Sequence, residues 1–243
     1  MMTYFLTSSP CCDDGSMNPK NGFAELFAAS LKTPCKALFI ASAPDDVVLT
    51  EQHAYDMKAN YEKSGITFSE YILLDRCTQD KAAELVQSAD FIVLAGGHVP
   101  TQLNFFQEIQ LRQLLQDFHG VLMGISAGTM NSADVVYVHP EREGETRFMD
   151  MQRYRQGLGL TKTMVIPHYQ MIKDWTLDGL RLFEDVAYTD SAKSGYDFYC
   201  LPDGSYLYGH DGIEELRGEA YRIHGGQLTQ ISHDGDILPM KGE

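Results

Sequence analysis

The 243-residue sequence has no apolar run that approaches the roughly 20 residues needed to cross a bilayer. Its first ten residues, MMTYFLTSSP, also lack the basic region, the long apolar core and the small-residue cleavage site of a signal peptide. These absences argue against a membrane-spanning chain and against a secreted one. We therefore expect a cytoplasmic globular protein without a membrane partner.

Paired cysteines and positive charge are also scarce. The five cysteines include no CxxC pair, and their odd number argues against a disulfide framework, so reduced thiols are expected. Only 19 Lys and Arg residues stand against 34 Asp and Glu residues, which gives a formal net charge of −15. Because acidic surfaces repel phosphate backbones, nucleic acid is not expected as a partner.

The first half of the chain contains a regular alternation of apolar strands and helices. Strands are predicted over residues 3–9, 36–43, 67–74, 91–97 and 121–125, and helices over 22–32, 47–65, 78–89 and 101–120. This order predicts an α/β fold with a mostly parallel sheet and helices on both of its faces. Such sheets bind ligands at the carboxyl ends of their strands, where Gly96, Gly97 and Ser126 are expected.

The second half is less regular. Residues 138–157 form a long charged loop, residues 160–169 a strand that ends near His168, and residues 174–186 a helix. From Phe198 onward, short strands separated by Asp-Gly, His-Gly and Gly-Gly turns predict a β-meander that extends or caps the main sheet. No linker or internal repeat interrupts the chain, so residues 1–243 are expected to form one domain.

The segment GISAG at 124–128 follows an apolar strand and is typical of a nucleophile elbow. Small residues two positions before and after Ser126 let the strand and the following helix approach each other, and Gly124 and Gly128 meet this need. A helix that begins at Ala127 directs free N–H groups toward a developing oxyanion. The alternative is a structural turn in which the serine is merely small.

A serine nucleophile needs a base, and eight histidines are available. His168 follows an apolar strand that would deliver it to the same edge of the sheet as Ser126. In contrast, His53, His119 and His233 are expected at the surface, and His139 lies in the charged loop. His168 is therefore the candidate base.

The base in turn needs a carboxylate to orient it, and Asp203 in LPDGS is the candidate, although Pro-Asp-Gly is also an ordinary turn sequence. The backbone N–H groups of Gly97 and Ala127 are candidates for an oxyanion hole, because glycine lets the backbone approach a substrate closely. The chain order Ser, His, Asp differs from that of the α/β-hydrolases.

Four segments occur in this order: LAGG, GISAGTMNSAD, IPHY and LPDGS. Together they resemble the peptidase E and cyanophycinase family of serine peptidases, relatives of the class I glutamine amidotransferases. The resemblance implies a flavodoxin-like fold with a nucleophile elbow, hydrolysis of dipeptides that in peptidase E begin with aspartate, and no metal or organic cofactor. It implies that Ser126 is the nucleophile, His168 the base, Asp203 the third member where peptidase E has glutamate, and Gly97 and Ala127 the oxyanion hole.

The resemblance also implies substrate contacts at Gly96, His98 and Thr129, although GGHVPTQ departs from the family pattern GGN. The 138–157 loop matches no family segment, and its arginines at 142, 147, 153 and 155 either bind a substrate carboxylate or are solvated. We expect a monomer or homodimer that acts on short peptides. The alternatives are a cyanophycinase-like or other small amide or ester hydrolase, and a catalytically silent ligand-binding module on the same fold.

Overall fold

The computed structural model describes residues 2–147 and 152–240. Eight strands of this part of the chain form the larger sheet: β1 (Thr3–Thr7), β2 (Cys35–Ile40), β3 (Phe68–Leu74), β4 (Phe91–Leu94), β5 (Val121–Ile125), β12 (Tyr206–His210), β13 (Ile213–Arg217) and β16 (Ile237–Met240). Their order is β16-β13-β12-β1-β5-β4-β2-β3. Five neighbouring strands, β1, β5, β4, β2 and β3, run parallel to one another. The other three, β12, β13 and β16, pair antiparallel and extend the sheet beyond β1. The expected mostly parallel sheet is confirmed.

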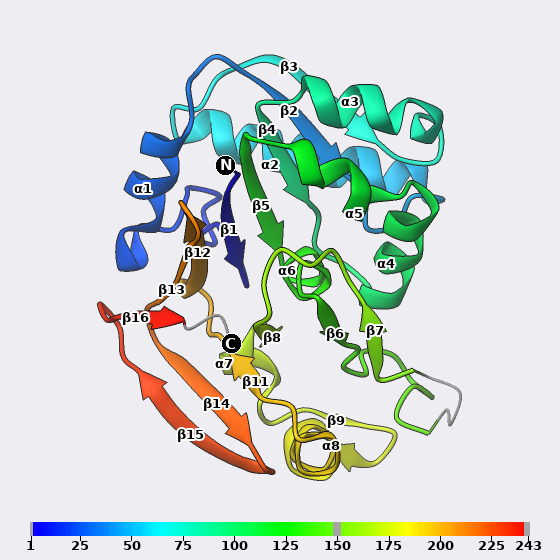
Figure 1. Cartoon of the computed structure of the whole chain (residues 1–243), viewed down its shortest axis with the longest axis vertical. Helices are drawn as coiled ribbons and strands as arrows, with labels where there is room; N and C mark the ends of the chain where they lie inside the picture. The colour runs from blue at the N-terminus through cyan, green and yellow to red at the C-terminus, as the bar shows by residue number, and fades with distance from the viewer. Residues whose placement is uncertain (1, 148–151, 241–243) are drawn as a thin grey trace.

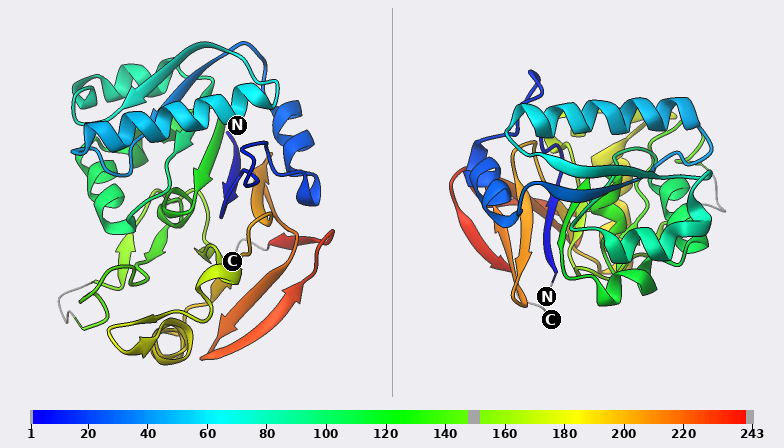
Figure 2. Two further views of the ribbon diagram at one scale, coloured as in Figure 1. Left: turned by 180° about the vertical axis from the view of Figure 1, so that it is seen from behind. Right: turned by 90° about the horizontal axis from the view of Figure 1, so that it is seen from above.

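Helices cover both faces of the parallel strands, also as expected (Figure 2). One face carries α1 (Phe23–Ser30) and α2 (Val47–Lys63), and the other carries α3 (Ala82–Ser88), α4 (Val99–Glu108) and α5 (Leu111–Leu114). Because successive strand residues point to opposite faces, β4 buries Phe91 and Val93 toward the first pair of helices and Ile92 and Leu94 toward the others. Short turns of 3-10 helix are η1 (Lys20–Gly22), η2 (Gln79–Lys81) and η3 (Leu115–Asp117).

A smaller sheet lies beyond the carboxyl ends of the parallel strands (Figure 1). It has the order β15-β14-β11-β8 and is built from β8 (Met164–Ile166), β11 (Phe198–Cys200), β14 (Ala220–His224) and β15 (Gln227–Ser232). The meander expected from Phe198 onward is therefore divided between two sheets. Three of its strands, β12, β13 and β16, extend the larger sheet, while β11, β14 and β15 belong to the smaller one.

The helix predicted over 174–186 is wrong for its first half. A hairpin of β9 (Thr176–Leu177) and β10 (Leu180–Arg181) stands there, followed by the π-helix η4 (Leu182–Ala187) and α8 (Tyr188–Ser194). Asp178 and Gly179 form the turn with φ values of 54° and 83°. Two successive positive φ angles are what a tight hairpin turn requires, and Asp-Gly favours them, so the turn sequence overrode the helical spacing.

Two other segments differ from what the sequence predicted. The helix predicted over 101–120 is broken at Gln110, whose φ of 55° ends α4 and redirects the chain into α5. Within the 138–157 loop, β7 (Tyr154–Gln156) pairs with β6 (Val135–Tyr137), and residues 148–151 of that loop lie outside the described residues. None of the helices in the described ranges has both the length and the apolar character needed to cross a bilayer.

Candidate active site

Ser126 stands at the turn between β5 and the short helix α6 (Ala127–Asn131). Its φ of 49° and ψ of −107° are a strained conformation for a residue with a side chain. A Cβ atom on Gly128 would lie 2.3 Å from the Leu94 carbonyl oxygen, and one on Gly124 would lie 3.0 Å from the Thr129 backbone. The requirement for small residues on both sides of Ser126 is thus confirmed, because β5, α6 and β4 touch at these two positions.

The end of β1 holds this turn in place. The Ser126 N–H donates to the Thr7 carbonyl over 3.0 Å, and the Thr129 hydroxyl donates to the same oxygen over 2.7 Å. Thr129 is 1% exposed, so its side chain is buried behind the elbow rather than presented to a substrate. The expected substrate contact at Thr129 therefore has a structural partner instead.

His168 and Asp203 come together because the two strands that precede them are parallel neighbours. In the β8–β11 register Ile166 lies opposite Cys200, so the residues that follow each strand emerge side by side. The His168 Nδ1 atom lies 2.8 Å from Asp203 Oδ1. Because a carboxylate only accepts hydrogen bonds, Nδ1 donates, and Nε2 is the ring nitrogen left for another partner.

Gln170 completes the support of this pair. Its side-chain amide donates to Asp203 Oδ2 over 2.7 Å, and its carbonyl oxygen accepts from the Asp203 N–H over 3.0 Å. Burial alone would raise the pKa of Asp203, but the His168 and Gln170 hydrogen bonds and the charge of His168 hold it below the ordinary value. Asp203 is therefore an ionised acceptor at neutral pH.

Ser126 and His168 line one cavity of about 350 Å³ at the carboxyl edge of the parallel strands. Within the described residues no hydrogen bond joins the Ser126 hydroxyl to the His168 ring, and such contacts are often long before a substrate binds. The Gly97 backbone also lines this cavity. Most of the other walls are apolar, with side chains that include Met130, Ile166, Met171, Ile172, Trp175 and Leu182.

Gly97 follows β4 and lines the same cavity as Ser126. Its φ is 153°, and a Cβ atom there would lie 2.4 Å from the Ser42 hydroxyl oxygen, so no other residue fits without displacing Ser42 in the turn after β2. No hydrogen bond within the described ranges engages the N–H groups of Gly97 or Ala127. Gly96 lies against Ser126, since a Cβ there would be 3.5 Å from the Ser126 Cβ.

His98, an expected substrate contact, uses both ring nitrogens within the protein. Nε2 lies 2.8 Å from Glu145 Oε1, and Nδ1 lies 2.7 Å from the Thr101 hydroxyl. The other Glu145 oxygen accepts the N–H groups of Glu141 and Arg142 over 2.8 and 3.0 Å. Burial lowers the pKa of His98 although Glu145 favours its charged form, so a neutral ring ties the start of α4 to the loop beyond β6.

Three of the four loop arginines are engaged away from the cavity. They are Arg147 with the Asp178 carbonyl, Arg153 with Asp190, and Arg155 with Asn104 and Gln107. The remaining one, Arg142, is exposed, and its guanidinium makes no ion pair in the part of the chain that the structure describes. Arg142 directly follows Glu141, which lines the cavity. It is therefore the one of the four that lies beside a cavity residue and whose guanidinium is not held by an ion pair within the described residues.

The sequence reasoning missed two polar residues of the cavity, His139 and Glu141. His139 is 4% exposed; one ring nitrogen bonds to the Leu182 carbonyl, and Nε2 has no partner. Burial lowers its pKa to about 4. Glu141 is exposed on the rim, yet the protein packed around its carboxyl, aided by the Glu145 charge, raises its pKa to about 8. The apolar run before His139 was the only sequence signal for its burial.

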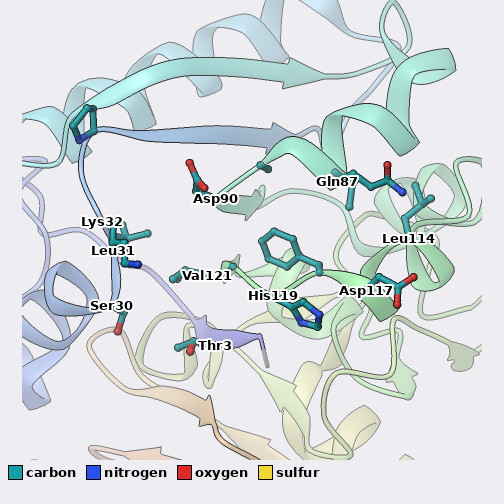
Figure 3. Close-up of a pocket in the computed structure, with 15 residues that line it drawn as sticks. Thr3, Ser30, Leu31, Lys32, Gln87, Asp90, Leu114, Asp117, His119 and Val121 are labelled. Atoms are coloured by element: carbon teal, nitrogen blue, oxygen red, sulfur yellow. The ribbon is translucent and has the colours of Figure 1, made fainter.

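A larger cavity of about 680 Å³ lies at the opposite, amino-terminal edge of the parallel strands (Figure 3). It is lined by the first residues of β1 and β5, Thr3 and Val121, together with Ser30, Asp90 and His119. The Ser30 hydroxyl donates to a carbonyl of its own helix, and in the described ranges no base contacts it.

In those same ranges no group of three or more His, Cys, Asp or Glu side chains is placed to hold a metal ion.

The comparisons with known proteins agree with one another. The model of peptidase family S51 matches residues 7–215, which include Ser126, His168 and Asp203. Among solved structures the chain is similar to a peptidase from an acI-B1 Actinobacterium, with a TM-score of 0.64 and 18% identity over 99% of this chain and 97% of that one. It is also similar to the "Putative Peptidase E Protein" of Listeria monocytogenes EGD-e, with a TM-score of 0.54 and 18% identity over 96% of this chain and 98% of that one. No curated protein matches the sequence.

Proposed function

This chain belongs to peptidase family S51 and is a serine peptidase, and from that starting point we propose that it hydrolyses dipeptides or other short peptides through Ser126, His168 and Asp203. The family match confirms the resemblance drawn from the four sequence segments. The observation that carries the proposal is one cavity lined by a serine in strained backbone and by a histidine whose other nitrogen is held 2.8 Å from a carboxylate.

In the proposed reaction the Ser126 hydroxyl oxygen attacks the scissile carbonyl carbon while His168 Nε2 takes its proton. The carbonyl π electrons move to the oxygen, and the N–H groups of Gly97 and Ala127 stabilise the resulting oxyanion. His168 then gives the proton to the departing amine as the carbon–nitrogen bond breaks. A water molecule, deprotonated by the same ring, resolves the acyl-enzyme and restores Ser126. Asp203 keeps the imidazole in the required tautomer and stabilises its protonated form.

The size of the cavity supports short substrates. A volume of about 350 Å³ lies at the lower end of the range for small-molecule sites, which suits one or two residues. The loop that carries Glu141 is held against the start of α4 through His98 and Glu145. This contact fixes the loop beside the cavity, which Gly97 and Glu141 line from either partner of the contact.

The experiment that tests the proposal is intact-protein mass spectrometry after incubation with a small fluorophosphonate. We expect one adduct on Ser126 in the wild type, none in Ser126→Ala, and labelling slowed by at least about 100-fold in His168→Ala. Ser69→Ala, which changes an exposed serine on β3, serves as the matched control and should label like the wild type. A folded wild-type protein that forms no adduct and cleaves no dipeptide would contradict the proposal and favour a silent ligand-binding module.

A further inference from the structure

The cavity beside Ser126 is lined mostly by apolar side chains, which is not what a site for an acidic residue requires. Apart from Ser126, His168 and the Gly97 backbone, its walls are apolar except for His139 and Glu141. Among the residues that the structure describes, none that lines it is a lysine or an arginine. An aspartate side chain placed there would lose its hydration without gaining a partner of opposite charge, which is costly.

The apolar wall is built on the segment that also carries the base. Met171 and Ile172 lie one helical turn after His168, in α7 (Tyr169–Ile172), and their N–H groups donate to the His168 carbonyl over 2.8 and 3.1 Å. Trp175 is joined to the same turn, because its N–H donates to the Ile172 carbonyl and its own carbonyl accepts the Leu182 N–H over 2.9 Å. The wall is therefore positioned by the backbone that positions the base.

Two of these apolar side chains remain open to solvent. Trp175, the only tryptophan of the chain, is 53% exposed, and Met171 is 55% exposed. Large apolar side chains that gather at a cavity and stay exposed are typical of a surface that another apolar group covers on binding. Because these side chains line the same cavity as Ser126, that group is part of the substrate molecule which the serine attacks.

The polar residues of the cavity supply no positive charge that could bind a carboxylate. Burial lowers the pKa of His139 to about 4, so its ring is neutral and brings no positive charge. The Glu141 carboxyl is neutral when protonated and negative when ionised, so it brings no positive charge either. Arg142 is exposed beside it and lies outside the lining, and residues 148–151, which complete the loop in the sequence, contain no lysine or arginine.

We propose that this cavity accepts the apolar side chain of the residue whose carbonyl Ser126 attacks, so that the enzyme cleaves after residues such as leucine or phenylalanine and discriminates against aspartate. The inference rests on the proposed function, since it takes Ser126 as the nucleophile. It departs from the aspartyl preference that the family resemblance implies. Trp175 and Met171 are then specificity-determining residues.

The first test compares α-aminoalkyl diphenyl phosphonates whose side chains are those of leucine, phenylalanine and aspartate. Each inactivates the enzyme by phosphonylating Ser126 with loss of phenol, so the rate reports the fit of the side chain even where turnover is slow. We expect the leucine or phenylalanine analogue to react at least about 100-fold faster than the aspartate analogue. The same order is expected for kcat/KM with Leu-Ala, Phe-Ala and Asp-Ala.

Variants then assign the preference to the wall. Trp175→Ala should slow the reaction of the phenylalanine analogue by about 10-fold and leave that of a glycine analogue unchanged, while Met171→Arg should raise the rate of the aspartate analogue at least about 10-fold. Tyr55→Ala, which removes an exposed aromatic ring from α2, is the matched control and should change no rate.

The failures are distinguishable. Ser126 labelling by the small fluorophosphonate together with a preference for the aspartate analogue would overturn the apolar cavity and keep the serine mechanism. If Arg142→Ala abolished that preference, Arg142 would be the carboxylate contact instead. An absence of labelling by every reagent would overturn the proposed function and this inference with it.

Discussion

His139 should make the protein sensitive to mild acid. Its ring is 4% exposed, lies between Tyr137 and Phe183 at centroid distances of 5.7 and 6.1 Å, and has one nitrogen without a partner. Burial lowers its pKa from 6.5 to about 4; the bond to the Leu182 carbonyl partly opposes this shift, and the charge of Arg153 adds to it. The folded protein thus excludes a proton that the unfolded chain binds.

The sign and size of the effect follow from this difference. Between pH 6.5 and pH 4 the unfolded chain carries more protons, so the free energy of unfolding falls as the pH is lowered. The full difference is worth about 3 kcal/mol at about 1.36 kcal/mol per pH unit. About 2 kcal/mol of it should be lost between pH 7 and pH 5.

The assay is urea unfolding followed by circular dichroism at pH 7, 6 and 5 for the wild type and for His139→Gln. Glutamine keeps a donor for the Leu182 carbonyl but cannot be protonated in this range. Every other acid-sensitive group is common to both proteins, so the difference between their free energies of unfolding isolates His139. We expect this difference to move by about 2 kcal/mol in favour of the variant between pH 7 and pH 5. If the two proteins lose the same stability on acidification, the reasoning is refuted.

Three further outcomes are expected. Asp203→Asn should lower kcat on a cleaved dipeptide by about 10³- to 10⁴-fold with little change in KM, because the amide no longer holds the required imidazole tautomer; a loss below 10-fold would contradict its role. Gly128→Ala should lower the free energy of unfolding in urea by about 3 kcal/mol, since its Cβ would lie 2.3 Å from the Leu94 carbonyl oxygen, and an unchanged midpoint would contradict the close approach. Iodoacetamide should alkylate exposed Cys77 in the native protein and spare Cys200, whose pKa is raised by complete burial, until denaturant is added; peptide mapping that finds equal labelling would contradict this.

The alternation of strands and helices was predictable because its signals are local. The central strands β4 and β5 are apolar on both faces, whereas the edge strand β3 exposes Ser69 and Glu70. Each parallel strand is followed by a helical pattern or by a turn of small residues. The elbow was predictable for the same reason, since Gly124 and Gly128 leave the space that the chain itself needs on either side of Ser126. Residues 174–186 carry two local signals, a helical spacing of apolar residues and an Asp-Gly turn. The helix predicted from the spacing was wrong for the first half, where the Asp-Gly turn forms a hairpin.

The site was only partly predictable. The sequence placed Ser126, Gly97 and His168 after strands, but it carried no information on which strands are neighbours in space. His168 meets Asp203 because β8 pairs in parallel with β11, although 35 positions separate the two residues in the chain. The burial of His139 and the occupation of both His98 nitrogens likewise depend on segments that lie far away in the sequence.

The sequence by itself therefore determined the class of fold, the nucleophile elbow and the candidate members of the site, because periodicity, residue size and turn chemistry act over a few neighbouring residues. Tertiary structure alone decided the pairing of His168 with Asp203 and the hydrogen-bond and ion-pair partners of Arg147, Arg153 and Arg155. It also decided the apolar wall that Trp175 and Met171 add to the cavity. These features depend on strand order and on packing between distant segments, and the interactions that select them exist only once the chain is folded.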